Sequence, residues 1–186
     1  NIEGYNVSDT RIENMKKFVQ PYFGRLEKEE ILTECFENES YRFNLWNKIY
    51  NSTICKKAIE YIKDAYYPKA NDFLIAFCAK TYIGINSENL YNYCFGLGST
   101  GSSDLTIENF RIYCYQAKVA KSLEKFVDQY CVKDQYFSIV KKISNKLLDE
   151  CIWHWNDHLT FELCNQGFRI MINMWGIEKV IAGFAR

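Results

Sequence analysis

The chain has 186 residues, 48% of them apolar, which is enough for a buried core and excludes general disorder. Its 23 basic and 23 acidic residues give a net charge of zero, so it lacks the field that holds phosphate backbones, and nucleic acid is excluded as a default partner. No apolar run reaches about 18 residues, so no membrane span is predicted.

Helical periodicity runs through most of the N-terminal half. Thr10 and Glu13 have the spacing of a capping box and predict a first helix, which Pro21 and Gly24 end. Apolar spacing predicts further helices over 26–37, 40–50, 53–66 and 71–82, and a short one from Ser87 to residue 93.

The strongest break in the sequence is the Gly/Ser-rich segment 96–104. Its first six residues spell G-x-G-x-x-G, but no buried strand precedes them and no strand–helix alternation follows, so a dinucleotide site is disfavoured. We interpret 96–104 as a hinge between an N-terminal helical module, 1–95, and a C-terminal one, 105–186.

The C-terminal half is more clearly helical. The spacing predicts one helix over 106–131, a second from 134 to about 155, and a last stretch over 160–182 that is broken or kinked at Gly167 and Gly176. Strand-like alternation is nearly absent. The sequence therefore predicts an all-α fold, a disulfide-stapled helical bundle built from two tandem helical modules.

Eight well-separated cysteines indicate four structural disulfides formed in an oxidising compartment. Their separation excludes C-x-x-C zinc or redox pairs. About 105 pairings are open, and two bonds within each half are preferred. In a single helix over 106–131, Cys114 and Cys131 would lie about 25 Å apart, too far to pair with each other. The cysteines are Cys35, Cys55, Cys78, Cys94, Cys114, Cys131, Cys151 and Cys164.

Three glycosylation sequons, at Asn6, Asn38 and Asn51, agree with passage through the secretory pathway. We therefore expect an extracellular protein. Because Asn1 does not begin a signal-peptide pattern, we expect the numbering to start after cleavage of such a segment.

The two histidines are the candidate metal ligands. His154 and His158 are spaced i, i+4, but Trp155 stands where a zincin has glutamate, and Glu162 is too far along the same helix to share one ion. Two helix histidines beside an aromatic core are the favoured interpretation. No nucleophile signature or paired carboxylates appear, so the sequence predicts neither an enzyme nor a bound cofactor.

One recurring pattern is not demanded by helix formation. Cys78 is followed by Tyr93-Cys94, and Cys114 by Tyr130-Cys131. This tandem Cys…Tyr-Cys arrangement resembles the bicycle proteins, a family of aphid salivary effectors that is named for the paired motif. The resemblance implies a non-enzymatic secreted protein that acts on plant targets in gall development or feeding, with these six residues in a structural role.

We therefore expect a secreted effector that binds a host protein or another host macromolecule. One alternative is a secreted carrier of a small apolar ligand or lipid. A second alternative is a metal-dependent enzyme that uses His154 and His158. The sequence leaves the molecular target and the oligomeric state open.

Overall fold

The computed structural model describes residues 2–3, 9–10, 13, 16, 20–42, 44, 48–60, 71–79, 81–84, 93–94, 105–130 and 134–186. These residues are mostly helical, and the strands among them form two separate two-stranded pairings. The predicted helical class is therefore confirmed.

The contacts of the backbone divide the chain into two compact units. Unit 1 comprises Asn1–Cys55 and Ile75–Ser103, and unit 2 comprises Lys56–Leu74 and Asp104–Arg186. Residues 56–74, which the sequence places in the N-terminal module, group with the C-terminal helices in this division. The predicted hinge over 96–104 lies outside the described residues, so the two tandem modules stay a prediction.

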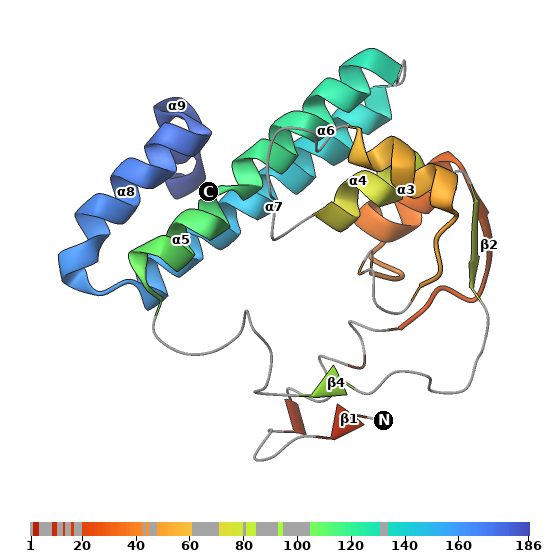
Figure 1. Ribbon diagram of the computed structural model, residues 1–186, viewed down its shortest axis with the longest axis horizontal. Helices are drawn as coiled ribbons and strands as arrows, with labels where there is room; N and C mark the ends of the chain where they lie inside the picture. Colours follow the sequence, from red (N-terminus) through yellow and green to blue (C-terminus); the bar gives the residue numbers. More distant parts are fainter. Residues whose placement is uncertain are drawn as a thin grey trace. The chain divides into compact units, whose positions relative to one another are not determined.

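Unit 1 combines short helices with two strand pairs (Figure 1). Strand β2 pairs antiparallel with β3, and β1 pairs parallel with β4. Helices α3 and α4 each run across the division between the units. In chain order the elements are β1 (Ile2–Glu3), β2 (Gly24–Glu27), α2 (Glu29–Leu32), the π-helical turn η1 (Thr33–Glu37), α3 (Ser52–Ile59), α4 (Asn71–Cys78), β3 (Thr81–Gly84) and β4 (Tyr93–Cys94).

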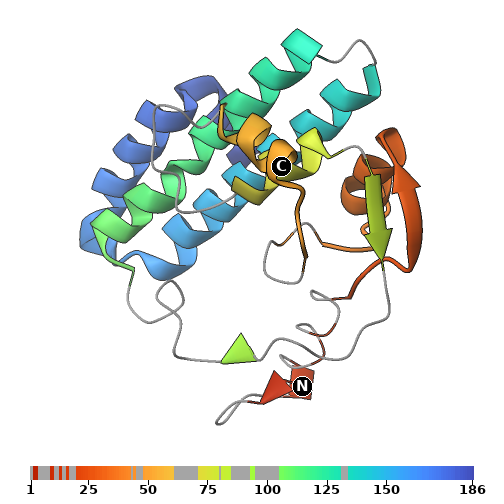
Figure 2. The same cartoon turned by 45° about the vertical axis from the view of Figure 1, so that its right-hand side comes forward.

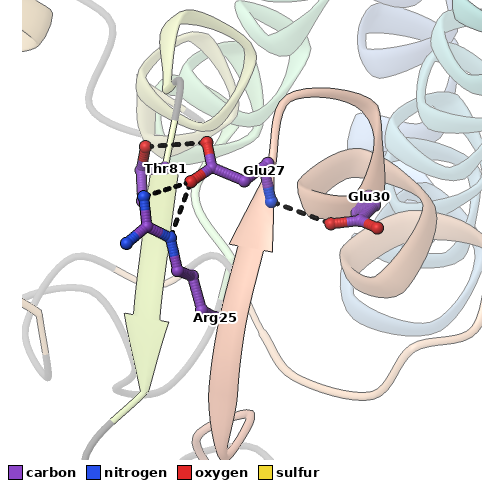
Figure 3. A network of polar contacts seen from close by, with 4 residues as sticks. All are labelled: Arg25, Glu27, Glu30 and Thr81. Carbon is purple, nitrogen blue, oxygen red and sulfur yellow. Dashed lines mark hydrogen bonds and ion pairs between the residues drawn. The ribbon is translucent and has the colours of Figure 1, made fainter.

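A polar network ties β2 to β3 and to the start of α2 (Figure 3). The Glu27 carboxylate accepts hydrogen bonds from Arg25 Nε at 2.7 Å and from Thr81 Oγ1 at 3.0 Å. These bonds, that from Arg25 first, lower the pKa of Glu27. The Glu27 backbone N–H donates to Glu30 Oε2 at 3.0 Å. The network fixes Thr81 opposite Glu27, as the strand register requires.

The predicted helices over 26–37 and 71–82 are wrong at the ends that form this ladder. Residues 24–27 form strand β2, and helix α4 ends at Cys78, before β3. The physical reason is the pairing of segments more than fifty positions apart, which satisfies the backbone groups of both without helical bonds.

The predicted helix over 40–50 is also wrong in its described residues, 40–42, 44 and 48–50. Glu39, with φ of 52°, turns the chain out of the preceding helix. The ring of Tyr41 then stacks on Tyr82, with centroids 4.6 Å apart, and its hydroxyl donates to the Ile31 carbonyl at 3.0 Å. Tertiary packing of this buried tyrosine therefore replaces local helical bonding.

Other predictions for this half are tested only in part. Residues 9, 10, 13 and 16 are helical, so the predicted helix is present in its described residues, but Thr10 lies within it and is not its N-cap. The helix predicted over 53–66 is present as α3, and its continuation past residue 60 lies outside the described residues. Of the helix predicted from Ser87, only residue 93 is described, and it lies in β4.

Unit 2 is built around one long helix. Helix α7 packs against α5, α6, α8 and α9, and α8 also packs against α5 and α9 (Figure 2). Thr106 caps α5 by accepting from the Asn109 N–H at 3.2 Å. The helices are α5 (Ile107–Cys114), α6 (Gln116–Tyr130), α7 (Asp134–His158), α8 (Phe161–Trp175) and α9 (Ile177–Phe184).

The apolar stripes read from the sequence form the core of this unit. Its fully buried side chains come from all five helices, which confirms the periodicity of α5 to α7. The largest are Phe110, Cys114, Val119, Leu123, Val127, Ile139, Leu148, Cys151, Met171 and Val180.

Two predictions about the helices of unit 2 are wrong. The single helix over 106–131 is two helices, α5 and α6, which are separated by a turn at Tyr115 whose backbone keeps helical angles, φ −61° and ψ −15°. The last stretch does break at Gly176, but α8 continues through Gly167. Gly167 is buried against α5 and α7 and serves close packing rather than a break.

Candidate functional site

Helix α9 presents large apolar side chains on two sides. On one side Val180 and Gly183 are buried, Gly183 against Leu148 and Ile152 of α7. On an adjoining side Ile177, Ile181 and Phe184 recur at i, i+4 and i+7 and remain 54%, 58% and 45% exposed. We call these three residues the α9 apolar face. Helical spacing places them along one side of α9.

An aromatic cluster extends this face onto two neighbouring helices. The Phe184 ring lies 5.4 Å from that of Trp155 on α7 and 6.1 Å from that of Phe168 on α8. Trp155 and Phe168 are themselves 6.0 Å apart, and the Trp155 indole N–H donates to the Cys164 carbonyl at 2.8 Å. Both side chains are only partly buried, so the cluster adds aromatic surface beside the α9 apolar face.

Two cationic side chains near this surface are paired within the unit. Lys179 Nζ lies 3.1 Å from Glu124 Oε1 and also faces the ring of Trp175. Arg186 pairs with Asp149. These two cations therefore already have carboxylate partners.

The two histidines lie in an aromatic setting at the end of α7. Their ring centroids are 5.3 Å apart, Tyr113 lies 3.8 Å from His154, and Trp153 lies 4.5 Å from His158. Glu150 Oε1 is 3.9 Å from His154 Nε2. Within the described part of the chain, no three His, Cys, Asp or Glu side chains are grouped closely enough to hold a metal ion.

Glu162 does not extend the histidine face as the sequence suggests, because α7 ends at His158 and Glu162 stands in the first turn of α8. Its pKa is lowered by a hydrogen bond to its own backbone N–H and, second, by the hydroxyl of Thr160, the residue that precedes α8. This carboxylate therefore interacts with groups at the N-terminus of α8.

Comparison of the chain with protein-family models, curated proteins and solved structures gives no match. The likeness to the bicycle proteins therefore rests on the paired motif alone.

Six of the described cysteines occupy three kinds of environment, and none of these six forms a disulfide bond in the structure. Cys35 and Cys78 are buried in unit 1, Cys114 and Cys151 are fully buried in unit 2, and Cys55 and Cys164 are partly exposed. The predicted disulfide roles stay predictions.

The paired motif is described only in part. Tyr93 and Cys94 form β4, and Tyr130 ends α6. Cys131 lies outside the described residues.

Two of the sequons lie on the surface. Asn38 and Asn51 are exposed, as a glycan acceptor must be, and Asn6 lies outside the described residues. The Asn38 amide donates to Glu34 Oε1 at 2.9 Å, whereas Asn51 uses its carbonyl oxygen to accept from the Thr53 N–H at 2.9 Å.

The α9 apolar face was not predicted from the sequence. A signal was present, since five of the eight residues after Gly176 are apolar and occupy two sides of a helix. Spacing could not say which of the two sides is covered, because that depends on the position of α7.

Proposed function

We propose that this chain is a secreted, non-enzymatic protein that binds a host plant protein through the α9 apolar face. The observation that carries this proposal is the exposure of Ile177, Ile181 and Phe184 on a helix that is anchored on an adjoining side by the buried Val180 and Gly183. A continuous exposed apolar surface of this kind marks a protein interaction site. Aromatic residues beside it, such as Trp155 and Phe168, are typical of the centre of an interface.

Charge supports a protein partner over a polyanion or an anionic membrane. The chain is neutral overall, and Lys179 and Arg186 beside the face are already paired with carboxylates. Among the described helices, none is both long enough and apolar enough to cross a bilayer. Binding driven by apolar burial should persist at high salt, whereas binding to phosphates would weaken steeply.

The compartment and the host come from the sequence. The tandem Cys…Tyr-Cys motif resembles the secreted salivary effectors, and the exposed Asn38 and Asn51 sequons are compatible with export. These features support secretion and do not depend on the α9 apolar face.

The expected contribution of the face follows from its exposure. Full burial of an isoleucine side chain is worth about 1.5–3 kcal/mol, so covering the exposed half of Ile177 or Ile181 contributes about 1 kcal/mol each. Replacing both should cost about 2 kcal/mol of binding free energy, which is roughly a 30-fold loss of affinity.

The test compares the Ile177→Ser/Ile181→Ser double variant with the unaltered chain. Each protein is immobilised on a resin and exposed to plant extract at low and at high salt. The captured plant protein is identified and purified, and its affinity for the unaltered chain and for the double variant is measured by titration. The matched control is Phe161→Ser, since Phe161 is 90% exposed on α8 outside the α9 apolar face. Thermal unfolding checks that both variants remain folded, as expected for surface positions.

Capture that is lost in the double variant, kept in the Phe161 control and insensitive to salt supports the proposal. Equal affinity of the double variant and the unaltered chain overturns it. The carrier alternative has its own readout, because stoichiometric lipid found by mass spectrometry of the extracted protein would replace the interaction proposal. Stoichiometric zinc in elemental analysis would reopen the alternative based on His154 and His158.

A further inference from the structure

Helices α5 and α7 bring two buried cysteines together in the core of unit 2. Cys114 is the last residue of α5, Cys151 lies in the second half of α7, and both are fully buried. Cys151 Sγ is 3.5 Å from the carbonyl oxygen of Tyr113, the residue immediately before Cys114. The Cys151 sulfur therefore lies against the turn that carries Cys114.

The protonation of Cys151 agrees with this placement. The neighbouring Cys114 thiol is the largest cause of the raised pKa of Cys151, and burial is the second. Two neighbouring thiols inside an apolar core can be oxidised to a disulfide.

A metal site does not account for the pair. No third His, Cys, Asp or Glu joins these two to make a metal-binding group within the part of the chain that the structure describes. Closed zinc sites use four ligands, and two thiols do not provide them.

We propose that Cys114 and Cys151 form a disulfide bond that joins the end of α5 to α7. The two thiols lose two protons and two electrons as the Sγ–Sγ bond forms. The electrons and protons pass to the disulfide of oxidised glutathione or of a thiol–disulfide oxidoreductase, which becomes two thiols, through a mixed-disulfide intermediate. This bond is one pairing among those left open by the sequence, and it depends neither on the α9 apolar face nor on any partner.

Burial determines when this bond forms and how it behaves. An oxidant cannot reach two fully buried sulfurs in the folded unit, so we expect oxidation before the core closes and resistance to reductant afterwards. Cys164 lies on α8 in the same unit and is partly exposed, so its thiol is more accessible to oxidants and reductants than the two buried thiols.

The experiment uses the full chain, reduced and unfolded, then refolded in a mixture of reduced and oxidised glutathione. Remaining thiols are blocked with N-ethylmaleimide, and the protein is digested without reduction by trypsin and a glutamate-specific protease. Trypsin releases Ile112–Lys118 around Cys114, and cleavage after Glu150 and Glu162 separates Cys151 from Cys164. The expected product is peptide 112–118 linked to peptide 151–162, with the mass of the pair less two hydrogen atoms.

Variants supply the controls. Cys164→Ser should leave the linked peptide unchanged, whereas Cys114→Ala or Cys151→Ala should abolish it and leave the remaining cysteine blocked by N-ethylmaleimide. The peptide map of the unaltered chain is informative even if a cysteine variant fails to fold. Cys114 or Cys151 linked to another cysteine, or both recovered as blocked thiols while other cysteines are oxidised, would overturn the proposal without bearing on partner binding.

Discussion

Replacing Gly167 by alanine tests the close packing on which unit 2 depends. A methyl group at this position of α8 would lie 2.5 Å from Leu159 Cδ1, 3.1 Å from Trp155 Cδ1 and 3.3 Å from Phe110 Cε1. The leucine methyl can move, but the Phe110 ring is fully buried and the Trp155 indole is held by its hydrogen bond to the Cys164 carbonyl, which leaves little room for adjustment. The added methyl therefore has to push α8 away from its neighbours.

Two effects of opposite sign set the magnitude. Alanine is about 1 kcal/mol more favourable than glycine inside a helix. Overpacking a filled core costs typically about 1–3 kcal/mol. We expect the packing cost to prevail, so that Gly167→Ala lowers the free energy of unfolding by about 1 kcal/mol, which corresponds to a fall of roughly 2–4 °C in the melting temperature.

The assay is urea unfolding followed by circular dichroism. The neighbouring residue Gln166 is exposed on the same helix, so the pair Gln166→Ala and Gln166→Gly measures the alanine–glycine difference without packing. If Gly167→Ala stabilises the protein by that same difference, position 167 tolerates a side chain and the packing argument fails.

Two further predictions concern backbone conformation and pH. Gly176 has φ of 86° and ψ of 145°, and no atom lies within 4 Å of the place that an added methyl group would occupy. Gly176→Ala should therefore lower the free energy of unfolding by conformational strain alone, by about 1–3 kcal/mol. Urea unfolding measures this, and an unchanged midpoint would contradict it. The Cys114 hydrogen bond and burial raise the pKa of Cys151, so above the ordinary thiol pKa of about 8.5 the reduced native chain keeps a proton that the unfolded chain releases. The contribution of Cys151 to stability should therefore be intact below that pH and fall by about 1.4 kcal/mol per unit above it, and Cys151→Ala should lack this part of the loss; parallel pH profiles for the two reduced proteins would refute the assignment.

The sequence by itself determined the helices of the C-terminal half. The stripe Val140, Ile143, Leu147 and Cys151 predicted α7 and its buried side, and the structure confirms both. The same holds for Phe110 and Cys114 in α5. Helix formation depends on bonds between residues four positions apart, so a local pattern of apolar residues is sufficient to reveal it.

The tertiary structure alone decided the features that depend on distant segments. Local periodicity could not show that residues 24–27 pair with 81–84, that Tyr41 stacks on Tyr82 outside any helix, or that Cys151 packs against the turn that carries Cys114. Local periodicity also predicted a break or kink at both Gly167 and Gly176. In the structure Gly167 leaves space for neighbouring side chains, whereas Gly176 adopts an unusual backbone angle. The exposure of the α9 apolar face belongs to this class, because which side of a helix is covered depends on the element that packs against it, and this is not encoded within the helix itself.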